Sequence, residues 1–455
     1  MLEDTIIAIS TPFGYGGMGI VRLSGSQSLD VAGKLFRPHS SSRKIPPRRP
    51  VLGDLYNSES KKAYDEAVLT YFPAPHSYTT EDVVELSCHG SPIILEEVVR
   101  LGIKAGARQA DHGEFTLRAY LHGRLDIIQA EAINDIIQAS SLNQAKISYR
   151  QLEGGLSRRL RALRGKIIHL LAQIEASIEF PDEGLRITRS AIRRTVTNAI
   201  RILDKLIDSY QTGKSLREGI SLALLGRANV GKSTLFNALL EDDRAIVTPY
   251  PGTTRDYLKE KILIEGKAFT IVDKAGMAVP SHPVEKEGIK RGKKIASAAG
   301  GLLLLFDASR KEEEEDRELI SRFRGKKAIT IFNKIDLPRK MDIAKVRSWD
   351  PTRPAIEISA LKGVHLERLK EMIHTQFGSV ENAEEEIILH LRQKLALEEI
   401  RDTLRQGLKE LDDGHSEEHY AEPFREALSA FGRLTGEVKT EQIIEDIFSR
   451  FCVGK

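Results

Sequence analysis

The chain has 455 residues, of which 41% are hydrophobic and 29% charged, and its formal net charge is +3. The length predicts about three domains of ordinary folded composition. The near balance of charge excludes an overall basic field for nucleic acid, so any such contact must come from a local patch. Two cysteines far apart in sequence, Cys88 and Cys452, exclude a disulfide framework and a zinc-binding spacing.

No membrane segment or secretory signal is expected. The opening stretch MLEDTIIAISTP carries acids, not a basic region, before a short apolar run. The most apolar stretch, Gly300 to Phe306, is too short to span a bilayer and predicts a buried strand. We therefore expect a cytoplasmic protein.

Residues 1–118 predict a small α+β domain. Four short runs with β-strand character, TIIAIS, GIVRLSG, EAVLTYF and DVVELSC, are separated by turns rich in glycine and proline. One helix is expected near Ile93–Lys104, where apolar residues recur at helical spacing.

The rest of the chain predicts an α/β domain inserted into a helical domain. Apolar residues recur at helical spacing over 119–217 and again over 379–455. Between them, over 218–378, the buried runs ISLALLG, FTIVD, GLLLLFD and AITIFN alternate with helical segments, which is typical of a parallel, doubly wound sheet. The acidic run KEEEEDRE at 311–318 is expected to be a solvated helix face.

A phosphate-binding loop follows the first of these strands. The segment GRANVGKST, Gly226 to Thr234, fits the pattern G-x-x-x-x-G-K-[ST] in the required strand–loop–helix setting. Backbone N–H groups and the N-terminus of the following helix are expected to hold phosphate oxygens. Lys232 is expected to reach the β- and γ-phosphates, and Ser233 to bind Mg²⁺.

Four further motifs in the right order predict a GTPase. They are PGTTRD, DKAG, NKID and SAL, in which Thr254 is the second expected Mg²⁺ ligand. Asp336 of NKID is expected to accept two N–H donors from the guanine edge, which adenine does not present. The expected GTP-binding residues are Asn229, Val230, Gly231, Lys232, Ser233, Thr234, Thr248, Pro249, Tyr250, Pro251, Gly252, Thr253, Thr254, Asp273, Gly276, Asn333, Lys334, Asp336, Ser359, Ala360 and Leu361.

The hydrolytic water needs a partner other than the usual glutamine. Ras-type enzymes place a water-orienting glutamine directly after the DxxG glycine, and this chain has Met277 there. The first switch also contains no obvious arginine finger. Another group must therefore orient the water and neutralise the developing charge.

Across nearly its whole length the chain resembles the MnmE (TrmE) family of tRNA-modification GTPases. The resemblance rests on the GTPase motifs and on the blocks DTIIAISTPFGYGGMGIVRLSG, SYTTEDVVELSCHG, HGEFTLRAYLHGRLDIIQAEA and GEVKTEQIIEDIFSRFCVGK. It implies a GTPase that acts with the flavoprotein MnmG, in a heterotetramer, to add an aminomethyl-type group at C5 of the wobble uridine of certain tRNAs. It also implies a homodimer.

The resemblance further implies activation by K⁺ in place of an arginine finger. The matching K⁺ ligands are Asn229, Thr248, Tyr250 and Thr253. Glu285 matches the residue that orients the hydrolytic water through a second water. Without the resemblance, Glu285 reads equally well as a charge on a helix face.

The amino-terminal domain of the family binds a 5-formyl- or methylene-tetrahydrofolate as the one-carbon donor. By matched motif, Arg22, Glu85, Arg124 and Lys455 are expected at that site. Glu85 is expected to pair with pterin N–H groups, and the cations with carboxylates.

Several positions depart from the family pattern. DKAG has Lys274 where the family has threonine, SYTGED reads SYTTED, and PGEFT reads HGEFT. Arg124 replaces a lysine, and the N-x-R-H block is reduced to HLRQ at 390–393. These changes affect the expected fine contacts to folate and K⁺, and they leave the family pattern intact.

The ending FCVGK has two open interpretations for its cysteine. A prenylation signal is disfavoured because the last residue is lysine. We expect instead a tail docked toward the folate or uridine site, with Lys455 supplying a cation. Cys452 is then either a reactive thiol or a packed side chain.

A different class of function stays open as the alternative, a ribosome-assembly GTPase of the Era/Der type. A KH-like domain with a GxxG loop, or a second GTPase domain, would favour it, and the sequence shows neither. The basic stretch SRRLRALRGK at 157–166 is a candidate tRNA contact, although an ordinary exposed helix face is the simpler interpretation.

Overall fold

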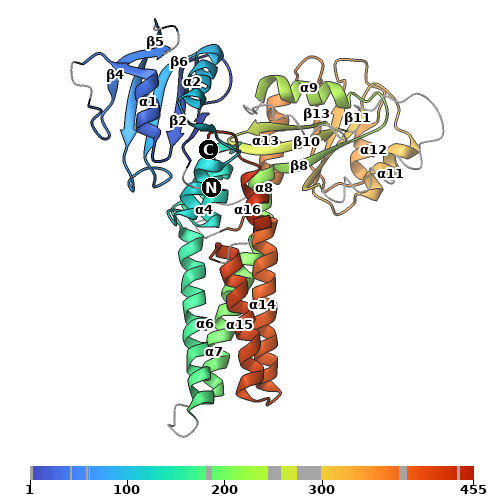
Figure 1. Ribbon diagram of the computed structural model, residues 1–455. Helices are drawn as coiled ribbons and strands as arrows, with labels where there is room; N and C mark the ends of the chain where they lie inside the picture. Colours follow the sequence, from blue (N-terminus) through green and yellow to red (C-terminus); the bar gives the residue numbers. More distant parts are fainter. Residues whose placement is uncertain are drawn as a thin grey trace, which may run out of the picture. The chain divides into compact units, whose positions relative to one another are not determined.

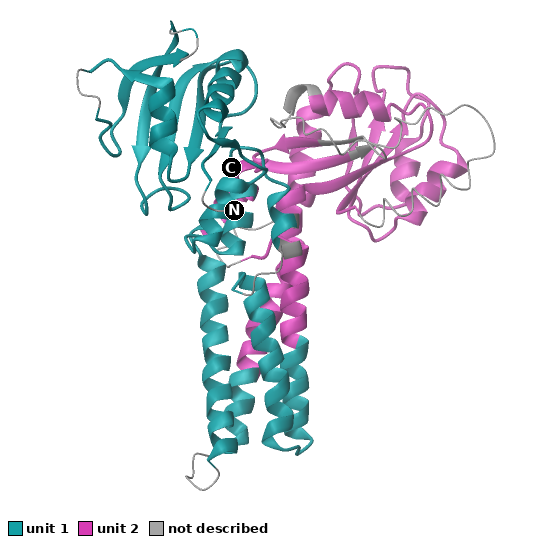
Figure 2. Cartoon of the chain, in the orientation of Figure 1, with its two compact units in different colours: residues 1–134, 151–196, 402–455 teal, residues 135–150, 197–401 magenta. Residues whose placement is uncertain are grey.

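The computed structural model describes residues 4–40, 44–57, 60, 62–180, 187–243, 258–273, 299–378, 387–437 and 441–455. The chain forms two compact units, which Figure 2 shows in different colours. Unit 1 comprises Met1–Asn134, Gln151–Val196 and Asp402–Lys455, and unit 2 comprises Asp135–Arg150 and Thr197–Arg401.

Unit 1 contains a seven-stranded sheet of order β3-β4-β5-β6-β2-β1-β7 (Figure 1). All neighbouring strands are antiparallel except β1 and β7, which are parallel. The four runs expected to be strands belong to β1, β2, β5 and β6, whereas β3, β4 and β7 were not anticipated. The strands are β1 (Ile6–Ile9), β2 (Gly16–Ser24), β3 (Phe36–Pro38), β4 (Val51–Asn57), β5 (Lys62–Phe72), β6 (Val83–Gly90) and β7 (Arg108–Gln109).

The two faces of this sheet have different partners. Helices α1 (Ser28–Leu35) and α2 (Pro92–Lys104) pack on one face, against inward side chains such as Val21 and Leu23. Because side chains alternate along a strand, Arg22 points to the opposite face. There Phe115, from α3 (Glu114–Leu121), packs beside Ile6. Arg22 therefore lies on the face of the sheet that α1 and α2 do not cover.

The helical part of unit 1 is built from long amphipathic helices. In α6 (Gly155–Glu179) the buried residues recur every three or four positions, as in Leu156, Leu160 and Leu163. This stripe packs against α15 (Glu417–Thr435). Unit 1 also contains most of α4 (Ile127–Ile137) and all of α16 (Glu441–Phe448). The helices α7 (Arg189–Asp208) and α14 (Leu391–Asp412) have residues in both units, and α5 (Leu142–Leu152) and α8 (Tyr210–Glu218) belong mainly to unit 2.

Unit 2 contains a six-stranded sheet of order β13-β12-β11-β8-β10-β9. The four runs expected to form a parallel sheet, now β8, β10, β11 and β12, do pair in parallel. The sheet is nevertheless mixed, because β9, which was not anticipated, pairs antiparallel with β10. The physical reason is the two-residue connection Glu265–Gly266, whose residues both have positive φ, as a tight hairpin turn requires. The strands are β8 (Ile220–Leu225), β9 (Leu258–Ile264), β10 (Lys267–Asp273), β11 (Gly301–Asp307), β12 (Ala328–Asn333) and β13 (Ala355–Glu357).

Helices cover both faces of this second sheet. On one face α9 (Lys232–Asp243) and α13 (Leu366–Phe377) bury residues such as Leu239 and Ile373. On the other, α11 (Glu314–Arg322) and α12 (Ile343–Ser348) bury Ile320 and Val346. The carboxyl ends of the parallel strands meet at one edge, where ligands bind in such sheets.

The acidic run at 311–318 is largely exposed and enters α11, as expected, and it also makes two sets of structural contacts. Glu313 and Asp316 form a reciprocal capping box at the start of α11, because the run supplies acceptors for unpaired N–H groups there. Arg227 of the phosphate-binding loop forms ion pairs with Glu313 (2.7 Å) and Glu315 (2.8 Å). Part of the run therefore fastens this loop to α11.

Thr80, which stands where the family pattern SYTGED has glycine, adopts φ +66°. This conformation is unfavourable for a residue with a branched β-carbon. Its neighbour Thr79 is fully buried and bonded to Ser24 Oγ at 2.6 Å, which holds the segment in place. The surrounding contacts thus impose a strained backbone on Thr80.

We predict that Thr80→Gly raises the free energy of unfolding by about 1 kcal/mol, because glycine adopts positive φ without strain. Thr80→Ala, which keeps the β-carbon, should stabilise less. Thermal melts of the three proteins measure the difference. A lower melting temperature for the glycine variant would contradict this account.

Candidate nucleotide and ligand sites

The phosphate-binding loop connects β8 to α9 in unit 2. Gly231 has φ +97°, and a β-carbon there would lie 2.3 Å from Asn333 Nδ2, so the position requires glycine. Lys232 begins α9, and its Nζ donates to the carbonyl oxygens of Gly226 (2.9 Å) and Arg227 (2.6 Å). Ser233 and Thr234 lie exposed in the first turn of α9. Backbone N–H groups at this helix start form an anion-binding position.

The NKID and SAL motifs interlock with this loop. Asn333, 2% exposed, donates its Nδ2 to Val230 O (2.9 Å) and accepts at Oδ1 from Ala360 N (2.9 Å). Asp336 accepts from Ser359 Oγ at 2.5 Å. One buried amide thereby connects the phosphate loop with the loop after β13. The side chain of Leu361, next in that loop, is 73% exposed.

Lys334 connects the same loop to β11. Its Nζ donates to Asn229 O (2.7 Å) and to Asp307 Oδ2 (2.6 Å). Burial raises the pKa of Asp307, but hydrogen bonds from Lys334 and Ser309 outweigh it and lower that pKa overall. Asp307 was missed in the sequence. The sequence feature that could have indicated Asp307 is its position as an acidic residue at the end of the buried strand GLLLLFD.

Several expected residues lie outside this geometry. Asp273 ends β10, and its side chain is not among those described. The positions outside the described residues are Thr248, Pro249, Tyr250, Pro251, Gly252, Thr253, Thr254, Lys274, Gly276, Met277 and Glu285.

The four residues expected at a folate site lie on or near the face of the unit 1 sheet that α1 and α2 do not cover. Arg22 on β2 and Glu85 on β6 are cross-strand partners, with Arg22 Nη2 2.8 Å from Glu85 Oε1. The guanidinium of Arg22 lies 5.4 Å from the ring centre of Tyr78, and that of Arg124 5.0 Å from the same ring. Arg124 also donates to Tyr78 O at 2.5 Å. Tyr78, which the sequence analysis did not single out, thus orients both cations.

The carboxyl-terminal tail docks on the same face, as expected. Phe115 N donates to Lys455 O (3.1 Å), and Gly113 N to Cys452 O (3.3 Å). Ser10 Oγ donates to Gly454 O at 3.1 Å, and a β-carbon on Gly454 would lie 2.1 Å from Ile9 O. Cys452 is a free cysteine and is partly exposed. The tail is therefore fixed by its backbone against β1 and the start of α3.

Electrostatics make the end of this tail attractive to an anion. Burial lowers the pKa of Lys455, and the positive charge of Arg22 lowers it further, while Cys452 and Glu85 act in the opposite direction. Two cations held close together and partly out of water gain from a ligand carboxylate or phosphate. The residues present thus fit a folate, which carries both N–H donors and carboxylates.

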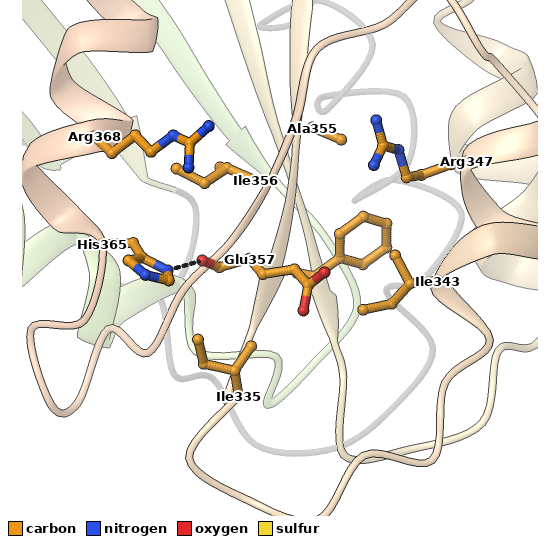
Figure 3. A pocket seen from close by; sticks show the side chains of 9 residues that line it. Ile335, Ile343, Arg347, Ala355, Ile356, Glu357, His365 and Arg368 are labelled. Carbon is orange, nitrogen blue, oxygen red and sulfur yellow. Dashed lines mark hydrogen bonds between the residues drawn. The ribbon is translucent and has the colours of Figure 1, made fainter.

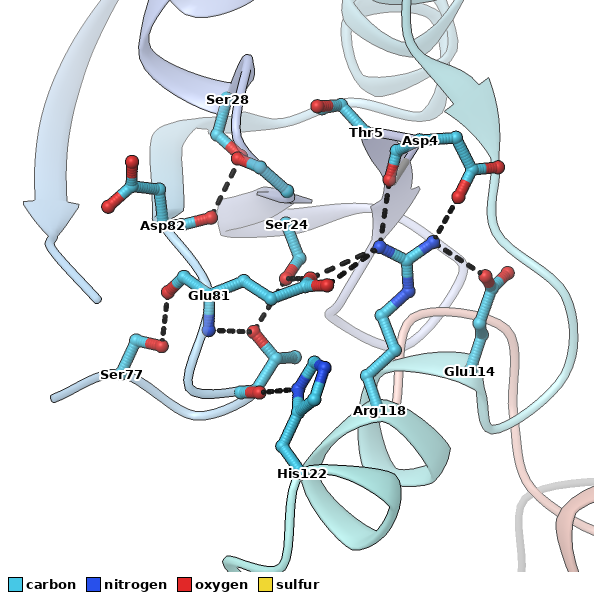
Figure 4. Close-up of polar contacts among 12 residues, drawn as sticks. Asp4, Thr5, Ser24, Ser28, Ser77, Glu81, Asp82, Glu114, Arg118 and His122 are labelled. Atoms are coloured by element: carbon cyan, nitrogen blue, oxygen red, sulfur yellow. Dashed lines mark hydrogen bonds and ion pairs between the residues drawn. The ribbon is translucent and has the colours of Figure 1, made fainter. Parts of the chain in front are cut away.

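A buried charge cluster around Arg118 joins three segments of unit 1 (Figure 4). The guanidinium of Arg118, only 1% exposed, contacts Asp4 (2.7 Å), Glu81 (3.1 Å) and Glu114 (2.9 Å). These carboxylates come from the entry to β1, the SYTTED segment and the start of α3. No local pattern in the sequence indicates this cluster, because the partners are separated by up to 114 residues.

Within unit 2, the HLRQ block at 390–393, which differs from the family pattern, makes a set of polar contacts. His390 Nε2 lies 2.7 Å from Asp135 Oδ2, and His390 Nδ1 lies 3.0 Å from Arg217 Nη1. Gln393 is fully buried and accepts from Leu389 N at 3.2 Å. The substituted block therefore still caps the start of α14 with satisfied polar groups.

Comparison with known proteins gives matches across both units. The model of the MnmE helical domain matches residues 127–452, and that of the GTP-binding protein TrmE N-terminus matches residues 5–124. The tRNA modification GTPase MnmE of Aquifex aeolicus is 40% identical over 458 residues, which cover 100% of both chains. The chain belongs to the MnmE family. The MnmE proteins of Thermoanaerobacter sp. and Thermotoga maritima are each 38% identical, over 460 and 458 residues.

As a member of the MnmE family of tRNA modification GTPases, the chain is a GTP hydrolase. Among solved structures, a variant of Aquifex aeolicus Era bound to GDP and aluminium fluoride matches at 25% identity and TM-score 0.28, covering 41% of this chain and 67% of that one. The G domain of Thermotoga maritima FeoB matches at 27% identity and TM-score 0.27, covering 34% and 98%. None of the described helices of this MnmE family member is long and apolar enough to cross a membrane.

We predict that Asn333→Ala weakens GDP binding at least about tenfold and costs about 2 kcal/mol of stability, because Val230 O and Ala360 N each lose a buried partner. Isothermal titration with GDP and thermal melts measure the two effects. Asn198→Ala, which removes an exposed amide from α7, serves as the matched control. Unchanged GDP affinity would show that the amide does not hold the two loops.

Proposed function

We propose that this chain acts with the flavoprotein MnmG to install an aminomethyl-type group at C5 of the wobble uridine of certain tRNAs, with a tetrahydrofolate as one-carbon donor. The observation that carries the proposal is the meeting of Lys455, Arg22 and Glu85 on one face of the sheet. The carboxylate of Glu85 offers an acceptor for pterin N–H groups, and the neighbouring cations favour an anionic ligand. Arg124 adds a third cation beside Tyr78.

Cys452 is proposed as a thiol available at this site. It lies within the docked tail, three residues before Lys455, and is partly exposed. In contrast, Cys88 is buried, and burial raises its pKa to about 11, which keeps that thiol protonated and unreactive. Of the two cysteines in the chain, Cys452 is thus the better suited to chemistry.

For GTP hydrolysis we assign roles by motif. Lys232 faces the β- and γ-phosphates, Ser233 and Thr254 bind Mg²⁺, and Glu285 orients the hydrolytic water. The K⁺ ligands are Asn229, Thr248, Tyr250 and Thr253. The exposed Asn229, with φ +62° at the outer turn of the phosphate loop, supports this assignment, because its side chain has room to bind an ion. When bound, K⁺ supplies the positive charge of an arginine finger.

We further propose that the functional domains are 1–118, 119–217 with 379–455, and the inserted GTPase domain 218–378. GTP hydrolysis drives a conformational cycle through the segments around the γ-phosphate. The working assembly is a cytoplasmic homodimer that joins MnmG in a heterotetramer and acts on tRNA.

Mass analysis of tRNA nucleosides tests the modification reaction. Cells that lack this protein should lose the C5 aminomethyl-type uridine, and the wild-type gene should restore it. Lys455→Met should restore less than about a tenth, because the cation at the ligand site is gone. Lys62→Met, an exposed lysine of β5, is the matched control. Retention of the modified uridine in cells lacking the protein would refute the proposal.

Potassium dependence is a separate test. We predict that GTP hydrolysis by the full chain is at least about tenfold faster in K⁺ than in Na⁺, since an arginine finger is worth ~10³ or more. Asn229→Ala should remove most of the difference between the two salts. Equal rates of phosphate release in the two salts would exclude the K⁺ mechanism.

A further inference from the structure

A groove opens along the free edge of the GTPase sheet in unit 2. It has a volume of about 340 Å³ and runs beside β13, between α12 and α13 (Figure 3). Among the strands that the structure describes, β13 has a neighbour on one side only, β12. No expected GTP-binding residue lines the groove.

The backbone of β13 presents hydrogen-bonding groups to this groove. Thr330 N donates to Pro354 O (2.9 Å), and Ile358 N donates to Phe332 O (2.8 Å), so residues 354 and 358 face β12. Because backbone groups alternate along a strand, Ala355 and Glu357 face the open side. Glu357 O already accepts from His365 Nδ1 at 2.9 Å. The N–H groups of Ala355 and Glu357 and the carbonyl of Ala355 remain directed to the groove.

Two arginines flank this edge. Arg347 on α12 and Arg368 on α13 lie on opposite sides of the strand in Figure 3. Both are exposed, and within the described part of the chain neither guanidinium has a hydrogen bond or ion pair. The lining carboxylate, Glu357, is paired with Arg339. The groove is therefore positively charged at both walls.

The floor of the groove is apolar. Phe332 is 1% exposed and Ile343 9%, and Ile335 completes the lining beneath β13. An apolar floor, an open strand edge and charged walls together match an extended peptide whose side chains alternate. A nucleic acid would use the arginines but not the backbone groups or the apolar floor.

We propose that an extended acidic segment of a partner protein binds here as an added strand on β13. Its backbone pairs with Ala355 and Glu357, its apolar side chains lie over Ile335 and Ile343, and its carboxylates bind Arg347 and Arg368. The positive charges of Arg347 and Arg368 require an acidic partner, because a basic segment would face two unpaired guanidiniums.

A labelled peptide tests this site on the full chain. Fluorescence anisotropy should detect binding of acetyl-VEVEVE-amide carrying fluorescein, and no binding of acetyl-VKVKVK-amide. The double variant Arg347→Ala, Arg368→Ala should weaken the acidic peptide at least about tenfold, since two charge-assisted contacts are lost. Arg322→Ala, an exposed arginine of α11 outside the groove, should leave binding unchanged.

A second variant separates strand addition from charge attraction. Ala355→Pro removes an outward N–H without touching the pairing with β12, so it should also weaken the peptide at least about tenfold. GTP hydrolysis and thermal melts report whether each variant is folded. Equal peptide binding by wild type and the double arginine variant, or no binding at about 1 mM peptide, would overturn the proposal. A single-stranded oligouridine that binds through the same arginines and displaces the peptide would assign the groove to nucleic acid instead.

Discussion

The buried guanidinium of Arg118 is the contact on which the amino-terminal site depends. It is surrounded by carboxylates from three separate segments, Asp4, Glu81 and Glu114. Removing one partner from such a buried group typically costs about 3–5 kcal/mol, because an uncompensated charge stays behind. The cluster thus fixes how the first strand, the SYTTED segment and α3 meet.

The cluster is connected to the docked carboxyl-terminal tail through α3. Glu114 begins α3, and the next residue, Phe115, holds the backbone of Lys455. Burial raises the pKa of Glu114, but hydrogen bonds from Arg108, from the Asp111 backbone and from Arg118 outweigh it, so that the net shift is downward. A carboxylate with a depressed pKa contributes stability above its unfolded pKa and loses it as the pH falls through its folded pKa. The start of α3, on which the carboxyl-terminal tail docks, is therefore expected to become less stable in acid.

In the GTPase half, one buried neutral amide and one ion pair hold the loops together. Asn333 ties the phosphate loop to the loop after β13, and Lys334 ties it to Asp307. Nucleotide recognition and loop shape are thus set by the same side chains. The sequence predicted this half well, because each motif carries its own local geometry: AITIFN became β12 as expected. It missed the antiparallel β9 and the edge strand β13, the latter because a strand of three residues carries no periodicity.

The sequence alone determined the family, the GTPase chemistry and the order of the strands that carry the motifs. These follow from local patterns, namely a glycine-rich loop before a helix and polar residues directly after buried strands. Only the tertiary structure decided how the FCVGK tail lies on β1 and α3, which carboxylates meet Arg118, and that Arg347 and Arg368 flank an open strand edge. Those contacts join residues far apart in the chain, and no local pattern records which distant groups the fold brings within hydrogen-bonding distance.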